Sequence, residues 1–184
     1  MESITTERLI LRSWKDSDYL PFFKINSDPD VMEYFPALLS HEESDEMATE
    51  IQHRINKNGW GFWAVEEKKS KMFIGFVGLN QPTYELPFNP CVEMGWRLSK
   101  QFWGVGYATE AANSAMEYAF DILSLNEVVA FTPAGNKRSR AVMERLGMTN
   151  SRKNFNHPNV PNNSTLKEHV LYKITREQWQ SSNT

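Results

Sequence analysis

Cysteine and long hydrophobic runs are what this sequence most clearly lacks. Cys91 is its single cysteine, which excludes an internal disulfide and a cysteine-based metal cluster. Its longest apolar runs fall far short of the ~20 residues that a membrane-spanning helix needs. The N-terminal segment Met1–Arg8 contains no apolar core of a secretory signal. We therefore expect a cytoplasmic protein that does not enter a membrane.

An excess of basic charge is also missing. The chain has 20 Lys and Arg residues against 23 Asp and Glu residues, so its formal net charge is −3 and we expect no nucleic-acid partner. Its 184 residues, of which 40% are hydrophobic, suffice for one sizeable core. We expect a single domain over residues 1–184, with its core at about residues 6–175.

The apolar pattern of the chain changes between the strand period and the helix period. It predicts strands at about 9–12, 62–66, 72–79, 91–98, 128–132, 148–155 and 168–174, and helices at about 16–27, 40–58, 107–123 and 136–146. Strands and helices alternate only in part. The pattern therefore indicates an α/β (α+β) fold, in which a central, mixed and mostly antiparallel twisted sheet of about seven strands has helices on both faces.

The most informative segment is the glycine turn, residues 101–110, which joins the strand at 91–98 to an alanine-rich helix. Gly104 and Gly106 allow the backbone to approach a ligand closely, and the helix that follows begins with free N–H groups. This combination is suited to binding phosphate. Most such glycine pairs are only turns, and this one lacks the third glycine of a dinucleotide fingerprint and the Lys-Ser/Thr of a nucleoside-triphosphate loop.

Four segments together resemble a known family. They are Thr6–Arg12, Val92–Leu98, Trp103–Ala111 and the stretch from Asn136 to Met148. In this order they resemble the GNAT acetyltransferases, and most closely the RimJ/RimL branch, which includes ribosomal-protein N-terminal acetyltransferases. The resemblance covers the chain from about residue 6 to residue 174.

The resemblance implies a GNAT-like domain that uses acetyl-coenzyme A as cosubstrate. The pyrophosphate would then bind to the backbone N–H groups of Trp103, Gly104, Val105, Gly106, Tyr107, Ala108 and Thr109. The pantetheine arm would lie like an added strand beside Met94, Gly95, Trp96 and Arg97. A backbone N–H near Met94 or Gly95 would polarise the acetyl carbonyl. Asn136 matches the family asparagine that bonds the pantetheine arm, although it also fits a helix N-cap.

Glu93 is the candidate general base. An amine acceptor is protonated at neutral pH, with a pKa of about 10.4 for a lysine and about 8 for an α-amine, and it must lose a proton before it attacks. A carboxylate beside the cosubstrate strand can take that proton, directly or through water. Glu93 lies on the opposite strand face from Met94 and Trp96. The structural alternative is a solvated glutamate in a salt bridge.

The group that protonates the leaving thiolate is not evident. Many GNAT enzymes have a tyrosine seven residues after the asparagine, but this chain has Met143 there, and methionine has no proton to donate. Ser139 is the nearest hydroxyl and is our candidate, with a plain first-turn helix serine as the alternative.

Other candidates are weaker. His157 and His169 are too far apart in sequence to indicate a metal pair, so we expect no metal and assign them a structural or substrate-loop role. We interpret Cys91 as a packing residue. Aromatic side chains near the expected acceptor side belong mostly to the core, although some of them can line the acceptor groove: Tyr34, Phe35, Trp60, Phe62, Trp63, Tyr84 and Phe88.

The sequence thus predicts an N-acetyltransferase that moves acetyl from acetyl-coenzyme A to a primary amine by direct attack. The acceptor is a peptide or protein N-terminus or, alternatively, a small amine such as an amino sugar, a polyamine or an antibiotic. A non-catalytic acyl-coenzyme A sensor is a further hypothesis, which Met143 favours and which the glycine turn and Glu93 oppose. The sequence leaves the acceptor open, as it does the choice between monomer and homodimer.

Overall fold

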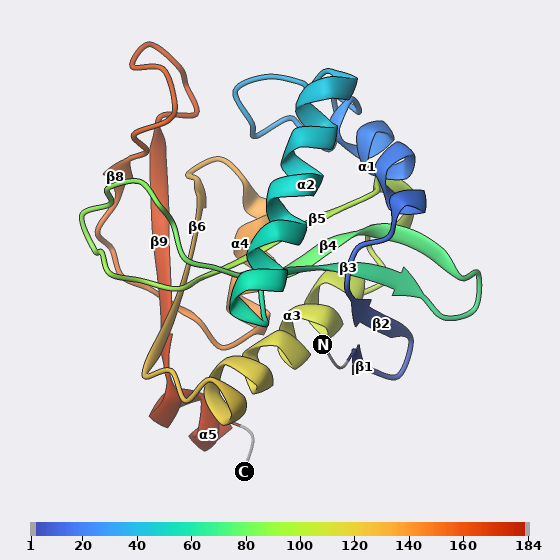
Figure 1. Ribbon diagram of the computed structural model, residues 1–184. Helices are drawn as coiled ribbons and strands as arrows, with labels where there is room; N and C mark the ends of the chain where they lie inside the picture. Colours follow the sequence, from blue (N-terminus) through green and yellow to red (C-terminus); the bar gives the residue numbers. More distant parts are fainter. Residues whose placement is uncertain (1–2, 183–184) are drawn as a thin grey trace.

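The structure is a computed structural model that describes residues 3–182. Within these residues one sheet contains nine strands, in the order β1-β2-β3-β4-β5-β6-β9-β7, with β8 paired to β9 (Figure 1). The strands are β1 Ile4–Thr5, β2 Leu9–Arg12, β3 Phe62–Glu67, β4 Met72–Asn80, β5 Glu93–Leu98, β6 Glu127–Pro133, β7 Thr149–Asn150, β8 Phe155–Asn156 and β9 Glu168–Thr175. The pairs are antiparallel except for β5 and β6, which run parallel. The predicted mixed, mostly antiparallel sheet is confirmed.

The number of strands exceeds the predicted seven. β1 is an addition of two residues, too short to show an alternating pattern. The strand predicted at 148–155 is instead two short strands, β7 and β8. Between them Arg152 has a φ of +56°, a left-handed conformation that turns the chain out of the strand direction.

Helices fill the connections between the strands. They are α1 Tyr19–Asn26, α2 His41–Asn58, α3 Tyr107–Glu117, α4 Lys137–Arg145 and α5 Arg176–Ser182. The first four lie where the sequence predicts them, and a π-helical turn at Tyr118–Ile122 extends α3. Helix α5 was not predicted, because its single buried residue, Trp179, gives no periodic pattern. No helix of residues 3–182 is long and apolar enough to cross a membrane.

Helix α2 has the ends that its sequence predicts. Ser40 Oγ accepts a hydrogen bond from Glu43 N at 3.1 Å, and Glu43 Oε2 accepts one from Ser40 N at 2.7 Å. Gly59 ends the helix with a φ of +79°. Such a cap contributes about 1 kcal/mol to helix stability, so both ends of α2 are well defined.

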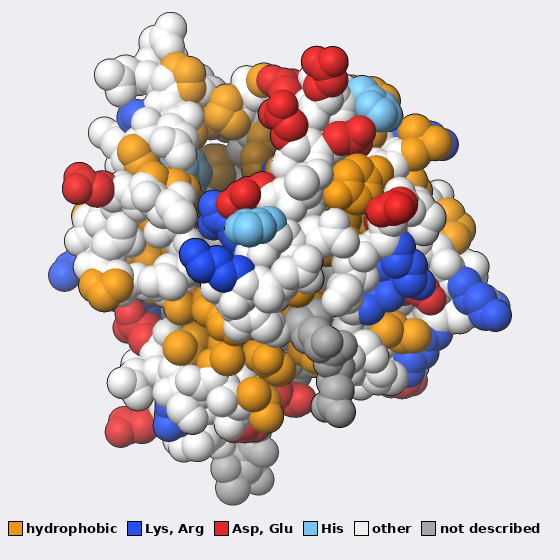
Figure 2. Space-filling view, viewed as in Figure 1, with side chains coloured by type: hydrophobic (Ala, Val, Ile, Leu, Met, Phe, Trp, Pro, Cys, Tyr) orange, Lys and Arg blue, Asp and Glu red, His pale blue; other side chains and the backbone are white. Residues whose placement is uncertain are grey.

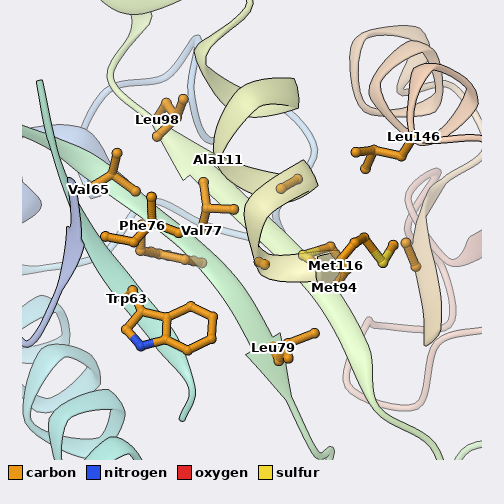
Figure 3. Packing of buried hydrophobic residues seen from close by; sticks show 14 of the residues in the cluster. Trp63, Val65, Phe76, Val77, Leu79, Met94, Leu98, Ala111, Met116 and Leu146 are labelled. Carbon is orange, nitrogen blue, oxygen red and sulfur yellow. The ribbon is translucent and has the colours of Figure 1, made fainter. Parts of the chain in front are cut away.

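Helices cover both faces of the sheet, as predicted. On one face Phe22 of α1 contacts the rings of Phe73 and Phe76 in β4, at centroid distances of 6.3 and 5.9 Å. On the other face Ala111 and Met116 of α3 pack over the residues that alternate with these, such as Val77 (Figure 3). Because alanine is small, α3 packs close to the sheet.

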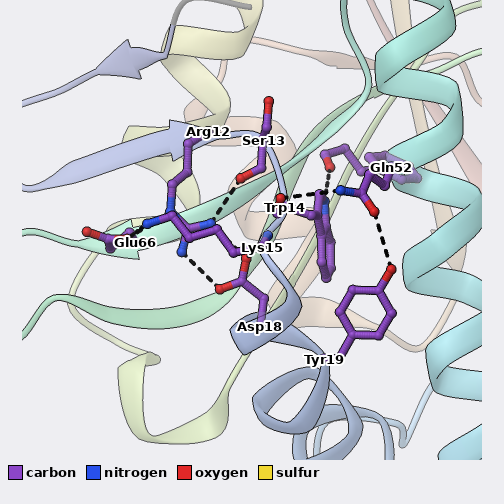
Figure 4. A network of polar contacts seen from close by, with 9 residues as sticks. Arg12, Ser13, Trp14, Lys15, Asp18, Tyr19, Gln52 and Glu66 are labelled. Carbon is purple, nitrogen blue, oxygen red and sulfur yellow. Dashed lines mark hydrogen bonds and ion pairs between the residues drawn. The ribbon is translucent and has the colours of Figure 1, made fainter.

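A polar network fixes α1 beside the edge of the sheet. Arg12 of β2 donates two hydrogen bonds to Asp18, at 2.7 and 2.9 Å, and its Nε donates to Glu66 of β3 at 2.8 Å (Figure 4). Trp14 Nε1 donates to the Phe62 carbonyl at 2.8 Å. Paired, geometrically matched ion pairs of this kind orient their elements strongly. They hold α1 over the face on which Glu93 lies.

Candidate active site

A cavity of about 1400 Å³ opens between β5 and β6. Its walls come from the loop between α1 and α2, from β5, from the glycine turn, from α4 and from the segment before β9. Figure 2 shows the molecule hollowed between α2 and the strands β8 and β9, with apolar side chains in the depth of the hollow. Each residue that the sequence marked as a catalytic or cosubstrate-binding candidate lines this cavity.

The cavity exists because β5 and β6 separate. Their ladder has one register pair, Glu93 with Val129, and Val129 N donates to the Val92 carbonyl at 3.0 Å. Beyond Glu93 the two strands share no further pair among the described residues, and the segment Met94–Leu98 lines the cavity. The β5 edge that faces the cavity can therefore pair with an extended ligand that carries amide groups.

The glycine turn forms one end of the cavity. Gly104 and Gly106 have φ values of +76° and +87°, a region that other residues rarely adopt. Glu110 N donates to the Gly106 carbonyl at 3.0 Å, whereas residues 104–109 have no recorded partner for their N–H groups among the described residues. Trp103 N already donates to the Lys100 carbonyl at 3.1 Å, so the N–H groups that remain available for a ligand begin at Gly104. Six such groups, in the turn and in the first three residues of α3, make a site for an anion.

The N-terminal segment braces this turn. Glu110 accepts hydrogen bonds from Thr6 Oγ1 at 2.6 Å, from Arg8 N at 2.8 Å and from Arg8 Nε at 2.6 Å. Arg8 Nη1 donates to the Val105 carbonyl at 2.9 Å. Burial raises the pKa of Glu110, but these hydrogen bonds outweigh it and leave the pKa below its usual value. This role of Arg8 was not predicted, although the Thr6–Arg12 segment contributes to the family resemblance.

Comparison with known proteins decides the family. Residues 8–149 match the family model described as acetyltransferase (GNAT) domain. The chain belongs to the GNAT acetyltransferase family. The predicted fold and the resemblance to GNAT acetyltransferases are thereby confirmed, and the protein is an acyltransferase.

Individual relatives agree with this assignment. The acetyltransferase is 34% identical over 163 residues to an FsC-acetyl coenzyme A-N(2)-transacetylase of Aspergillus fumigatus, covering 85% of this chain and 68% of the relative. A solved GNAT-family acetyltransferase of Bacillus anthracis has a TM-score of 0.78 at 23% identity, over 96% of this chain and 99% of the other. A spermidine N-acetyltransferase of Vibrio cholerae, solved in complex with CoA and spermine, has a TM-score of 0.73 at 20% identity, over 94% and 98%. At these identities the two structures show the shared fold.

Glu93 lies at the point where β5 and β6 part, on the face opposite Met94. Asn80 Nδ2 donates to Glu93 Oε1 at 2.6 Å. Glu93 forms no ion pair among the described residues, which removes the salt-bridge alternative. Burial raises its pKa to about 7, and the Asn80 hydrogen bond and the charge of Arg54 offset this only in part. A carboxyl group that titrates near neutral pH is suited to accept a proton.

A chain of polar contacts links Glu93 to α2. Arg54 Nη1 donates to Asn80 Oδ1 at 3.0 Å, and Arg54 Nε donates to Glu50 at 2.7 Å. Asn80 thus accepts a hydrogen bond at Oδ1 and donates one from Nδ2 to Glu93, so the orientation of its amide group is fixed from both sides. The sequence shows the Glu50–Arg54 pair as a four-residue helix spacing, but it gives no sign that Arg54 reaches β4.

Asn136 and Ser139 lie together at the start of α4, on the cavity wall. Asn136 Oδ1 accepts from Ser139 N at 3.2 Å, so Asn136 caps the helix. Its Nδ2 donates to Thr132 Oγ1 at 3.0 Å and to Ser139 Oγ at 3.1 Å. Because Ser139 Oγ accepts from Asn136, its own hydroxyl proton is free to point elsewhere. Met143 also lines the cavity and is 2% exposed.

The two histidines, distant in sequence, lie together in the structure. The His157 and His169 ring centroids are 4.8 Å apart, and Tyr84 Oη lies 3.3 Å from His157 Nε2. Pairing of β8 with β9 places Phe155 opposite His169 and so brings His157 alongside. Burial lowers the pKa of both histidines, that of His169 to about 4, so both rings are neutral at pH 7. Residues 3–182 contain no group of three or more potential metal-ligating side chains that could hold an ion.

The aromatic candidates divide between core and cavity. Trp63 is 1% exposed and belongs to the core. Those that line the cavity are Tyr34, Phe35, Phe62 and Tyr84. Cys91 packs against a small apolar cluster that includes Leu86. Burial, together with the charge of Glu93, raises the pKa of its thiol to about 11.

Cations that were not predicted as site residues line the cavity. They are Lys137, Arg138 and Arg145, and Arg138 lies at the glycine-turn end of the cavity. The Arg138 guanidinium lies 4.5 Å from the centre of the Trp103 ring and pairs with Glu33 at 2.7 Å. The signal was present as a basic run directly after Asn136. Positive charge around the free N–H groups strengthens an anion site.

Proposed function

We propose that this acetyltransferase moves acetyl from acetyl-coenzyme A to a primary amine by direct attack, with Glu93 as general base. The observation that carries the proposal is the position of Glu93. This partly buried carboxyl group lies on the cavity wall where β5 and β6 separate, and its pKa is about 7. It lies beside the strand segment that the family resemblance assigns to the pantetheine arm.

The residues of the cavity fit the proposed cosubstrate. The N–H groups of residues 104–109 would hold its pyrophosphate, with Arg138 nearby over the Trp103 ring. The separated edge of β5 would pair with its two amides, and the N–H of Met94 or Gly95 would polarise the acetyl carbonyl. The cosubstrate supplies an acetyl group activated as a thioester. The family relationship and the relative that is named for acetyl-coenzyme A support this choice.

The proposed proton steps assign roles to Glu93 and Ser139. Glu93 takes a proton from the ammonium group of the acceptor, directly or through water, and so produces the free amine. The amine nitrogen forms the new bond to the acetyl carbon, and the bond from that carbon to sulfur breaks. Ser139 would give its hydroxyl proton to the leaving sulfur and regain a proton from the second one that the attacking nitrogen loses. The thiolate needs little help, because a thiol with a pKa of about 8.5 leaves readily.

The acceptor is proposed in two classes. A peptide or protein N-terminus fits the RimJ/RimL resemblance. A small amine is the alternative, which the name of the spermidine N-acetyltransferase relative supports. Met143 in place of the usual tyrosine favours a non-catalytic sensor as the competing function, but the pKa of Glu93 supports catalysis, because a sensor needs no base.

Two measurements test this proposal. Thermal shift with acetyl-coenzyme A should raise the melting temperature, and a panel of N-terminal peptides and small amines should include acceptors that release free thiol. Binding of the cosubstrate without thiol release from any amine would favour the sensor. No thermal shift at all would refute both functions.

A further inference from the structure

Within residues 3–182, Arg97 is a buried cation without a carboxylate partner. Its side chain lies in the cavity wall, and the residue is 7% exposed. Nη1 donates to Asn26 Oδ1 at 2.6 Å, but the buried Nε has no hydrogen-bond partner in the described part of the chain. Arg97 also forms no ion pair there. A guanidinium in this position is costly unless a further partner compensates its lost hydration.

The surroundings of Arg97 leave the plane of the guanidinium well defined. Phe35, from the loop between α1 and α2, lies over it at 4.1 Å, and Phe76 of β4 lies at 5.5 Å. Met47 Sδ of α2 lies 3.6 Å from Nη1. A stacked guanidinium is held in one orientation, and its rigid fork of donors matches a carboxylate.

Arg97 and Glu93 share one face of β5. They are four residues apart, so their Cα atoms are separated by roughly 13 Å. Gly95 lies between them, where an added Cβ would come within 2.9 Å of the Phe62 ring. Phe62 therefore covers the strand between the base and the cation, and both side chains border the same cavity.

The phosphates of the cosubstrate are a poor match for Arg97. The unpaired N–H groups of residues 104–109, with Arg138 over the Trp103 ring, already offer a site for an anion at the glycine turn. That turn leads into α3, on the opposite face of the sheet from Asn26 and Met47, the contacts of Arg97. The remaining ligand of the reaction is the acceptor.

We propose that the acceptor carries a carboxylate that binds Arg97 while its amine lies at Glu93. This inference rests on the proposed function. The substrate class is an amino acid or short peptide with a free carboxylate. An extended chain of two or three residues spans about 7 to 11 Å, somewhat less than the roughly 13 Å that separates the two Cα atoms.

Paired acceptors test the inference by kinetics. Glycine, diglycine, triglycine and lysine are each compared with the corresponding carboxamide, which keeps the amine and removes the negative charge. The unmodified enzyme should favour the best carboxylate over its amide by about ten- to a hundredfold in kcat/KM, the usual range for a hydrogen bond to a charged group. In Arg97→Gln this ratio should fall to about one, and Arg97→Lys should restore part of it. Equal use of acid and amide by the unmodified enzyme, or an unchanged ratio in Arg97→Gln, would overturn the inference.

A binding measurement separates this inference from the proposed function. Calorimetry compares N-acetyltriglycine with its carboxamide in the presence of coenzyme A, and it needs no turnover. An Arg97-dependent preference for the acid supports the anion site even if no amine is acetylated. Turnover of amines without any such preference refutes the inference and leaves the function intact.

Two controls address the fold and the cosubstrate. The Arg97→Gln variant keeps an amide donor for Asn26, and its melting temperature is measured first. If this variant does not fold, the acid-to-amide ratio of the unmodified enzyme decides alone. If it folds and loses coenzyme A affinity while the acid-to-amide ratio stays unchanged, Arg97 serves the cosubstrate and the inference is wrong.

Discussion

Asn80 Nδ2 donates a 2.6 Å hydrogen bond to Glu93 Oε1, and the two residues face each other directly across β4 and β5. The bond fixes one oxygen of the carboxylate and leaves Oε2 without a recorded partner among the described residues. Arg54 in turn holds Asn80 Oδ1 at 3.0 Å. The proposed base is thus oriented by a side chain whose own orientation is set from α2.

Replacing Asn80 should change the pH dependence of the reaction. Asn80→Ala removes a hydrogen bond that favours the charged form of Glu93, so the pKa of Glu93 should rise above its value of about 7. The acidic limb of the kcat/KM profile should move to higher pH by about one unit, since a hydrogen bond to a charge contributes about 1.5 kcal/mol or more. The measurement is a pH profile with acetyl-coenzyme A and a fixed amine. Asn162→Ala, in the exposed loop before β9, is the matched control, and an unmoved limb in Asn80→Ala would contradict the assignment.

Replacing Glu93 should affect chemistry rather than cosubstrate binding. Glu93→Gln keeps the size of the side chain and can still bond to Asn80, but it cannot take a proton. Turnover should fall by about 10²- to 10⁴-fold, the range for loss of a general base, and the acidic limb should disappear. Affinity for coenzyme A, measured by calorimetry, should stay unchanged. Glu117→Gln, on the exposed side of α3, should behave like the unmodified enzyme. Normal turnover in Glu93→Gln would exclude Glu93 as base.

The same variant should reveal the cost of burying Glu93. The pKa of this carboxyl is about 7 when folded and near 4.5 when unfolded, so the folded state binds the proton more tightly. Stability from this group is therefore greatest at low pH and falls as pH rises from about 4.5 through 7. Glu93→Gln removes that loss, so above pH 7 the variant should gain up to about 3 kcal/mol in its free energy of unfolding. Denaturant titrations of both proteins at pH 5 and pH 8 give the difference; a gain that is equal at both pH values would show that Glu93 is not the cause.

The local elements and the glycine turn could be predicted from the sequence, but the contacts around the site could not. Gly104, Gly106 and the alternation in β5 are local signals, and each stands where it was expected. Arg97 was predicted as part of the cosubstrate strand through its backbone, whereas the burial of its side chain depends on how α1 and α2 pack. The contact between His157 and His169 could not be predicted, because it depends on the pairing of β8 with β9. β8 has only two residues, which is too short for a recognisable strand pattern.

Gly106 should be essential for binding the cosubstrate. Its φ of +87° disfavours any branched residue, and a Cβ there would lie 3.4 Å from Arg8 Nη2, beside the proposed path of the phosphates. Gly106→Val should therefore abolish the thermal shift with coenzyme A. Gly59→Val is a matched control for strain, because Gly59 has a φ of +79°, ends α2 and has open space around it. Both variants should lose about 1 to 3 kcal/mol of stability. Retained coenzyme A affinity in Gly106→Val would contradict the anion site.

Ser139 should contribute to the departure of the thiolate and not to the helix cap. Asn136 caps α4 through the backbone N–H of Ser139, which a Ser139→Ala variant keeps, so α4 should stay intact and the melting temperature should change little. Turnover should fall by about tenfold, because a thiolate leaves without protonation but less easily. The decisive measurement is the same variant with a cosubstrate analogue whose leaving thiol is more acidic: the defect should shrink, since a weaker base needs less protonation. Ser181→Ala, exposed in α5, controls for the loss of a hydroxyl. A defect of the same size with both leaving groups would mean that Ser139 positions Asn136 instead, through the 3.1 Å bond between them.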